Sequence, residues 1–342
     1  MGVNLVAVAL HGSRSDIFIW HRYYIPSYAM AALLAGMGVQ WLSERMPRAR
    51  LLPLALPLLG LVLNFREFDR SRYRIAEDFS HKLLQQIPPG AHLSASDDNI
   101  LFVLIYLHLV EGVRPDLDLV LQGVGSANLP PLRFNPDHEA LFFTHHPNWR
   151  VPALDIVPVG LVFRVARAGG PPPPIVLPRE PLAGEDDPRV PKEYLTQNLV
   201  GHYHYMLGST LERLDWSRAA AEFAEAVRRA PGNDVLFYNL GLIYSGNGLF
   251  EEALAFFVRS NEINPRHIAS VSRVRPADKV REMRLEVERL KAIEARLAEG
   301  IGASAGPEYH RQMAMRLAAA GEPLAANGHR LRARTTSAQA SR

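Results

Sequence analysis

The sequence predicts a mixed fold in three parts: a membrane helical hairpin, a small α/β domain and an α-helical repeat array. Three observations lead to this prediction. Two uncharged apolar stretches lie near the start, strand-like and helical segments alternate after them, and one pattern recurs farther on at a spacing of 34 residues. We expect membrane helices in 1–66, the α/β domain in 67–168, a proline-rich linker in 169–192, the helical array in 193–334 and a disordered tail in 335–342.

Composition limits the classes of function. A chain of 342 residues has room for two or three domains. The net charge of +3 is too small to indicate nucleic-acid binding, and no nucleic-acid motif is present. The absence of cysteine excludes a disulfide framework and thiolate metal sites. No phosphate-binding loop, nucleophile elbow or zinc-protease motif occurs, so we expect no cofactor, no metal and no catalytic residue within the chain.

The predicted membrane hairpin depends on two segments without charge. Residues 26–42 are flanked by aromatic side chains at both ends, and a helix between these aromatics rises roughly 26 Å. Residues 51–65 are also uncharged but shorter, and Pro53 and Pro57 interrupt them. The alternative is a pair of buried helices in a soluble domain. The apolar residues 3–10 are too short to span, so we expect either the remainder of an interrupted membrane helix or a short N-terminal arm.

The α/β domain follows from a change in periodicity. Residues 69–86 carry apolar side chains at helical spacing and end at a proline pair. A short strand (91–96), a helix capped by Asp97 or Asp98 and a second strand (114–123) follow, which predicts a parallel pair with a right-handed crossover. Two further strands are expected at 139–146 and 159–166.

The recurring pattern combines small, aromatic and proline residues. The positions that carry it are Ala219, Phe223, Ala226 and Pro231, then Leu240, Gly241 and Tyr244, then Ala253, Phe257, Ser260 and Pro265. This series resembles the tetratricopeptide repeat, a helix-turn-helix unit of 34 residues that serves as a protein-binding scaffold. Two repeats cannot bury a core of their own, so we expect the helices after residue 276 to cap them.

A wider resemblance is carried by the order of several segments. They are His21–Tyr28, Asn64–Phe79, Asp98 with Asn99, Val110–Asp116 and Gly160–Val165. Taken in order, they are similar to the C-terminal part of a bacterial membrane-protein family related to the GT-C glycosyltransferases and to protein O-mannosyltransferases with a repeat tail.

This resemblance implies transfer of a sugar from a polyprenyl phosphate to an acceptor at the outer face of the bacterial inner membrane. The acceptor is expected to be a protein. The acidic catalytic loop of such enzymes precedes the part of the family seen here. The chain is therefore expected to be a non-catalytic C-terminal portion whose repeat tail binds the acceptor or a partner outside the cytoplasm. The alternative is a membrane-anchored repeat scaffold with no link to glycosyl transfer.

Two pairs of residues are candidates for substrate binding. His21 and Arg22 precede the first uncharged stretch, where they could meet a lipid phosphate or could simply anchor the interface. Asp98 and Asn99 follow the first strand, where they could bind a sugar hydroxyl or could cap the next helix.

Other polar groups are expected to be structural. Arg114 and Asp116 flank a proline and should fix the turn into the second strand. The histidine pairs His145–His146 and His202–His204 could hold a metal, but neither has a third ligand at useful spacing.

Overall fold

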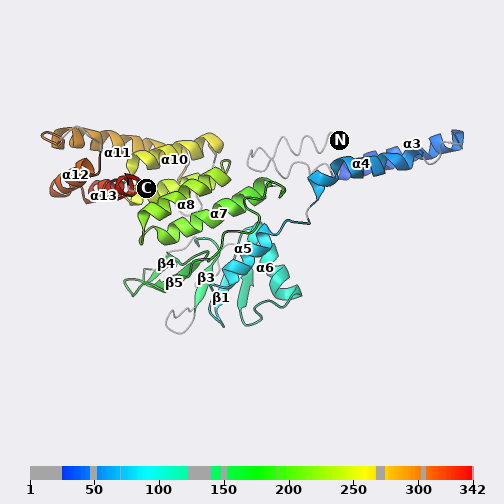
Figure 1. Ribbon diagram of the computed structural model, residues 1–342, viewed down its shortest axis with the longest axis horizontal. Coiled ribbons are helices and arrows are strands. Elements are labelled where there is room, and N and C mark those ends of the chain that lie inside the picture. Colours follow the sequence, from blue (N-terminus) through cyan, green and yellow to red (C-terminus); the bar gives the residue numbers. More distant parts are fainter. Residues whose placement is uncertain are drawn as a thin grey trace. The chain divides into compact units, whose positions relative to one another are not determined.

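The computed structural model describes residues 25–46, 52–69, 71–121, 140–147, 152–190, 192–266, 274–301 and 306–340 (Figure 1). The chain divides into two compact units, one of residues 1–73 with 187–191 and the other of residues 74–186 with 192–342. The first unit contains the helices α3 (Ile25–Arg45) and α4 (Leu52–Phe68). All other described helices and strands belong to the second unit.

The predicted membrane hairpin is wrong. Helices do occupy both segments, but in the part of the chain that the structure describes, none is both long and apolar enough to cross a membrane. α4 has 17 residues, a rise of about 25 Å. α3 has 21 residues, but Gly36, Gly38, Gln40 and Glu44 dilute its apolar character. A stretch without charge is therefore not the same as an apolar span. The expected location in an inner membrane was tied to this hairpin and stays a prediction.

The second unit begins with a five-stranded mixed sheet and its helices. Its elements are α5 (Ile75–Leu84), β1 (His92–Ala95), α6 (Asp98–Ile105), the π-helical turn η3 (Tyr106–Val110), β2 (Asp118–Leu121), β3 (Leu141–Phe143), β4 (Leu154–Pro158) and β5 (Phe163–Arg167). The strand order is β2-β1-β3-β5-β4. β1 pairs in parallel with β2 and with β3, while β5 pairs antiparallel with β3 and with β4. The predicted parallel pair of β1 and β2 is confirmed.

The central strands are buried on both faces of the sheet, because Leu93, Ser94 and Ala95 of β1 and every residue of β3 are buried. Leu93 and Ala95 on β1 are fully buried, and α5 places Phe79 and Leu83 in the same core. The turn from β4 to β5 needs Gly160, whose φ of +81° is unfavourable for other residues. A Cβ at Gly160 would also collide with the Gln86 side chain, which accepts a hydrogen bond from the Leu161 amide at 2.7 Å.

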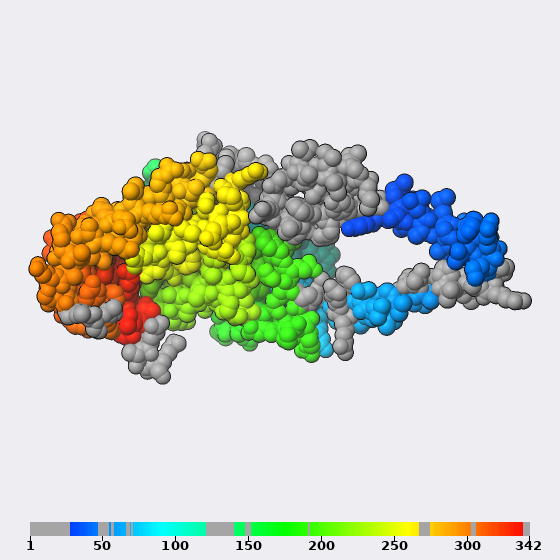
Figure 2. Space-filling model, turned by 90° about the horizontal axis from the view of Figure 1, so that it is seen from above, coloured from blue at the N-terminus to red at the C-terminus, as the bar shows by residue number. Residues whose placement is uncertain are grey.

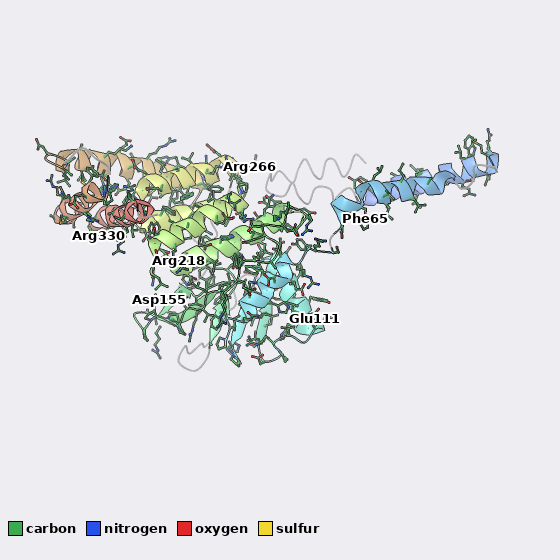
Figure 3. The ribbon with its side chains drawn as sticks, in the orientation of Figure 1. Phe65, Glu111, Asp155, Arg218, Arg266 and Arg330 are labelled. Carbon is green, nitrogen blue, oxygen red and sulfur yellow. The ribbon has the colours of Figure 1, made fainter. Side chains whose placement is uncertain are left out.

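Seven helices follow the sheet in the part of the chain that the structure describes, and six of them form three pairs of consecutive helices (Figure 1). In Figure 2 the same helices extend from green through yellow and orange to red. They are α7 (Tyr194–Leu211), α8 (Trp216–Arg229), α9 (Asp234–Gly246), α10 (Phe250–Ile263), α11 (Pro276–Leu297), α12 (Pro307–Ala319) and α13 (Pro323–Ala340). Side-chain caps begin two of them: Asp215 accepts from the Arg218 amide at 3.2 Å, and Asn233 accepts from the Leu236 amide at 2.9 Å. Figure 3 shows Arg218 on α8 and Arg330 on α13.

The hairpins α7–α8 and α9–α10 repeat one packing unit. In each, a glycine of the first helix lies against a buried ring of the second, so that Gly208 faces Phe223 and Gly241 faces Phe257. A Cβ on either glycine would lie only 2.5–2.6 Å from a ring carbon. The last three helices cover the second hairpin, because Val287 of α11 and Leu317 of α12 share a core with Phe257.

The final helix also returns to the first hairpin. Leu331 on α13 joins the core that contains Trp216 and Phe223 of α8. Gly328 on α13 packs against the backbone of Gly248, in the turn between α9 and α10, with no room for a side chain on either glycine. The array is thus closed by its own C-terminal helices, as the sequence predicts.

Candidate functional site

The residues of the recurring pattern all lie in the two hairpins. Those that are buried are Ala219, Phe223, Ala226, Leu240, Gly241, Ala253 and Phe257. Tyr244 is half-buried, and Pro231 and Pro265 are exposed just beyond the ends of α8 and α10. Ser260 replaces the alanine of the first copy. It is fully buried, and its hydroxyl donates to the Asp234 carbonyl at 2.9 Å.

Gly208 and Gly241 occupy equivalent positions in the two hairpins, so the sequences of the hairpins can be compared position by position. Six residues before Gly241 lies Val235, and six residues before Gly208 lies His202. The two positions differ in what covers them. Val235 is 47% exposed, and Leu242, two turns along the same face of α9, is 40% exposed. The equivalent face of α7 is instead packed against the sheet side of the unit, where the His145 ring stacks on His202.

The carboxyl ends of β1 and β3 form the second candidate site. Ser96 follows β1 and Thr144 follows β3, and the two residues are clamped together. The Thr144 hydroxyl accepts from the Ser96 amide at 3.0 Å and donates to the Ser96 carbonyl at 3.1 Å. The chain runs from β1 to β2 on one side of β1, whereas β3 lies on the other side. Ligands of open α/β sheets bind at such switch points.

Asp97 caps the helix that leaves this edge. Its carboxylate accepts from the Asn99 amide at 2.9 Å, and its backbone adopts a φ of +75°, which is uncommon for a residue other than glycine. Asp98 and Asn99, the predicted contacts of a sugar hydroxyl, are the first two residues of α6 at this same edge. Their role in substrate binding stays a prediction. The other predicted pair, His21 and Arg22, lies outside the described residues.

Two histidines that are far apart in sequence meet beside this edge. The rings of His145, after β3, and His202, on α7, stack with centroids 4.4 Å apart and an interplanar angle of 17°. Burial lowers the pKa of the His145 imidazole, although the Asp97 carboxylate opposes the shift. Burial and the neighbouring His145 ring hold the pKa of His202 well below its ordinary value. Both rings are therefore neutral at pH 7.

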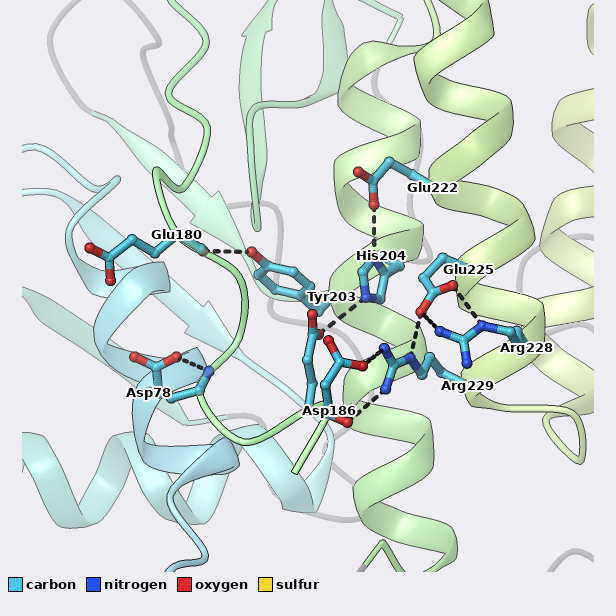
Figure 4. A network of polar contacts seen from close by, with 11 residues as sticks. Asp78, Glu180, Asp186, Tyr203, His204, Glu222, Glu225, Arg228 and Arg229 are labelled. Carbon is cyan, nitrogen blue, oxygen red and sulfur yellow. Dashed lines mark hydrogen bonds and ion pairs between the residues drawn. The ribbon is translucent and has the colours of Figure 1, made fainter. Parts of the chain in front are cut away.

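The other members of the two histidine pairs have separate surroundings. His146 packs its ring edge against Phe163, 5.5 Å between centroids. His204 lies between two carboxylates, with Nδ1 2.7 Å from Glu222 and Nε2 3.2 Å from Glu185 (Figure 4). Burial opposes its charge, but these two hydrogen bonds outweigh burial and raise the pKa of His204 to about 9. Among the described residues, no group of three side chains is arranged to hold a metal ion.

The same network ties the linker before α7 to the first hairpin. Glu185 belongs to the segment after the proline run, and its carbonyl accepts from Arg229 of α8 at 2.6 Å. Arg229 also pairs with Asp186 of that segment and with Glu225 of its own helix (Figure 4). The Tyr203 hydroxyl of α7 donates to the Glu180 carbonyl at 3.2 Å. The linker is therefore held by a buried histidine and an arginine.

Arg114 and Asp116 have the structural role that the sequence predicts. Arg114 adopts a φ of +55° and donates to the carbonyls of Leu84, Ile87 and Pro88 at 2.5–3.1 Å. Its paired bonds to Asp116, at 2.9 and 2.8 Å, hold the pKa of that carboxyl well below its ordinary value. The pair joins the end of α5 to the turn into β2.

These features define an array of antiparallel helical hairpins joined to an α/β unit. The second hairpin also identifies the class of repeat. Residues 236–267, which include most of α9 and all of α10, match the tetratricopeptide repeat family. No curated protein and no solved structure matches the chain. The chain thus contains a tetratricopeptide repeat, and the expected kinship with GT-C glycosyltransferases has no support in these comparisons.

Proposed function

We propose that the chain is a protein-binding scaffold whose partner docks on the open face of α9. The observation that carries the proposal is the pair of exposed apolar side chains, Val235 and Leu242, on the first helix of the matched repeat. Repeat arrays present such faces as extended binding surfaces. In the first hairpin the equivalent face is already covered by the α/β unit, so the second hairpin offers the available surface.

The partner is expected to place apolar side chains against this face. Val235 and Leu242 are seven residues apart, about two helical turns, so they form one row with Asn239 between them. The central amide can pair with a backbone group of the partner, while the flanking side chains lose apolar surface to it. This chemistry fits a short apolar segment of another protein.

The proposal can be tested with peptides that are selected from a displayed random library for binding to the full chain. Titration calorimetry then compares the wild type with the double variant V235E/L242Q. Loss of the two anchors should weaken binding by about thirtyfold or more, since a single anchor residue at the centre of an interface contributes about 2 kcal/mol. Glutamate in the first turn of α9 is favourable for the helix, so the fold should persist.

Met315→Glu is the matched control, because Met315 is a comparably exposed apolar residue on α12. It should leave binding unchanged. The proposal is wrong if the peptides bind V235E/L242Q as tightly as they bind the wild type. It is also wrong if Met315→Glu weakens peptide binding as much as V235E/L242Q does.

A narrower version of this function follows from the resemblance to sugar-transfer enzymes, in which the bound partner is the acceptor of a glycosyl transfer. Neither the family match nor the described residues favour that version. Protein binding is therefore proposed without a sugar, a polyprenyl phosphate or a membrane as partner.

A further inference from the structure

The His145–His202 stack joins two layers of the second unit. His145 comes from the carboxyl end of β3, and His202 from the N-terminal half of α7. The His202 ring also lies 6.1 Å from the Tyr205 ring and 6.1 Å from the Phe79 ring of α5. The pair thus closes a cluster of rings at the place where the first helix of the array rests against the sheet side.

We propose that this stack is an acid-sensitive lock, which holds α7 against the carboxyl edge of the sheet while both rings are neutral and loosens α7 when they take up protons. The geometry gives the reason. Two imidazolium rings 4.4 Å apart would repel one another in a site screened poorly by water. In addition, Nε2 of His202 is buried and has no hydrogen-bond partner among the described residues, so a proton on that nitrogen lacks an acceptor. A hydrogen bond with the Thr144 backbone favours the charged form of His202, but burial outweighs it.

The groups around the stack do not supply a counter-charge for both rings. Asp97, at the end of β1, faces His145 and partly opposes the effect of burial. Tyr205, on α7, stays neutral because burial raises its pKa to about 12. His146 turns toward β5. No carboxylate acts on His202 in the way that Asp97 acts on His145 among the described residues.

The sign of the pH dependence follows from these lowered pKa values. The unfolded chain binds protons at these two histidines below about pH 6.5, before the folded chain does. The stabilisation is therefore complete above pH 6.5 and is lost as the pH falls below it. Each histidine can change the opening equilibrium by up to about tenfold per pH unit.

The loosening should be local to one half of α7. Near its C-terminal end, Thr210 exchanges two hydrogen bonds with Gly160 in the β4–β5 turn, at 2.9 and 3.1 Å. This anchor contains no titrating group. Gly201, the residue before His202, packs closely against Ala230, which directly follows α8. Movement at the stack will therefore loosen the start of the first hairpin while the end of α7 remains held.

The test is hydrogen exchange of the full chain, followed by mass spectrometry at pH 7.0 and pH 5.5 and corrected for the intrinsic rates. We expect segments within 194–205 and 141–147 to lose about tenfold or more of their protection at pH 5.5. Segments of α9 and α10 should change much less. The double variant H145F/H202F keeps two stacked rings that cannot titrate, so its exchange at the two pH values should agree.

The control is His81→Gln, which removes a histidine from α5 and should keep the acid response. Equal protection of 194–205 at both pH values in the wild type would overturn the proposal, as would an acid response retained by H145F/H202F. If that variant does not fold, the imidazole proton resonances of the wild type decide. The resonances that H145F and H202F single variants assign to these two rings should titrate below the ordinary pKa of histidine, and their titration at the ordinary value would refute the lock. No partner is needed, so the result is independent of the proposed protein binding.

Discussion

Replacing His204 by glutamine should remove a pH-dependent stabilisation of the first hairpin. The difference between a pKa of about 9 and the ordinary 6.5 corresponds to about 3 kcal/mol, at about 1.4 kcal/mol per pH unit. The side chain of His204 is 10% exposed, but its closer partner Glu222 is 30% exposed, so solvent screening reduces the expected value to about 2 kcal/mol.

The sign follows from the raised pKa. The folded chain holds the His204 proton more tightly than the unfolded chain does, so the stabilisation is fully present below pH 6.5. It is lost as the pH rises through about 9. Glutamine has no such charge. The cost of His204→Gln should therefore be about 2 kcal/mol larger at pH 6 than at pH 10.

Trp216 provides the assay, because it is buried in the core of the first hairpin. Replacing the other three tryptophans, Trp20, Trp41 and Trp149, by phenylalanine leaves its fluorescence as the reporter of urea unfolding. The free energy of unfolding of this background and of its His204→Gln variant is then compared at both pH values. The acid-sensitive stack is present in both proteins and cancels from the difference. A cost that is the same at pH 6 and pH 10 would refute the assigned charge on His204.

Three further substitutions test the packing. Gly241→Leu should lower the free energy of unfolding by about 1–3 kcal/mol in a urea titration, because the Phe257 ring leaves no room for a side chain. An unchanged urea midpoint would mean that the register of the hairpin is wrong. Arg114→Met should cost about 2–3 kcal/mol in thermal melts, because it leaves the carbonyls at the end of α5 without donors, and Lys82→Met on the same helix serves as its comparison. Gly328→Val should release α13 from the Gly248 turn, seen as faster proteolysis after residue 323, whereas the exposed Arg330→Ala should not.

The repeat array was predictable because its signal is local and periodic. Small and aromatic residues recur at a spacing of 34 residues, which is typical of helical hairpins in which a small residue packs against a ring. Gly241 and Phe257 make this contact. The capping role of α11 followed from its apolar stripe, which includes Val287 and Leu290. The parallel pair of β1 and β2 followed from the short links around the helix between them. β4 was missed, because prolines at 152 and 158 make that segment look like a loop.

The remaining site features depend on distance in sequence or on conformation. His145 and His202 are separated by a loop, two strands and the linker, and nothing near either residue in the sequence signals the other. In the sequence, His204 looks like one of two metal ligands together with His202. In the structure its partners are Glu185 of the linker and Glu222 of α8. The positive φ of Asp97 directly follows the clamp between Ser96 and Thr144, which are 48 residues apart. The predicted membrane hairpin failed for a different reason, since lack of charge was taken for sufficient apolar length.

α7 belongs to two structures at once. One side of it completes the sheet layer through His202 and Thr210, and the other side begins the repeat array through Gly201 and Gly208. A different array grafted after the linker would have to reproduce both sides of that single helix. The α/β unit and the array therefore constrain one another during sequence change, and a substitution on α7 that suits one neighbour must be acceptable to the other.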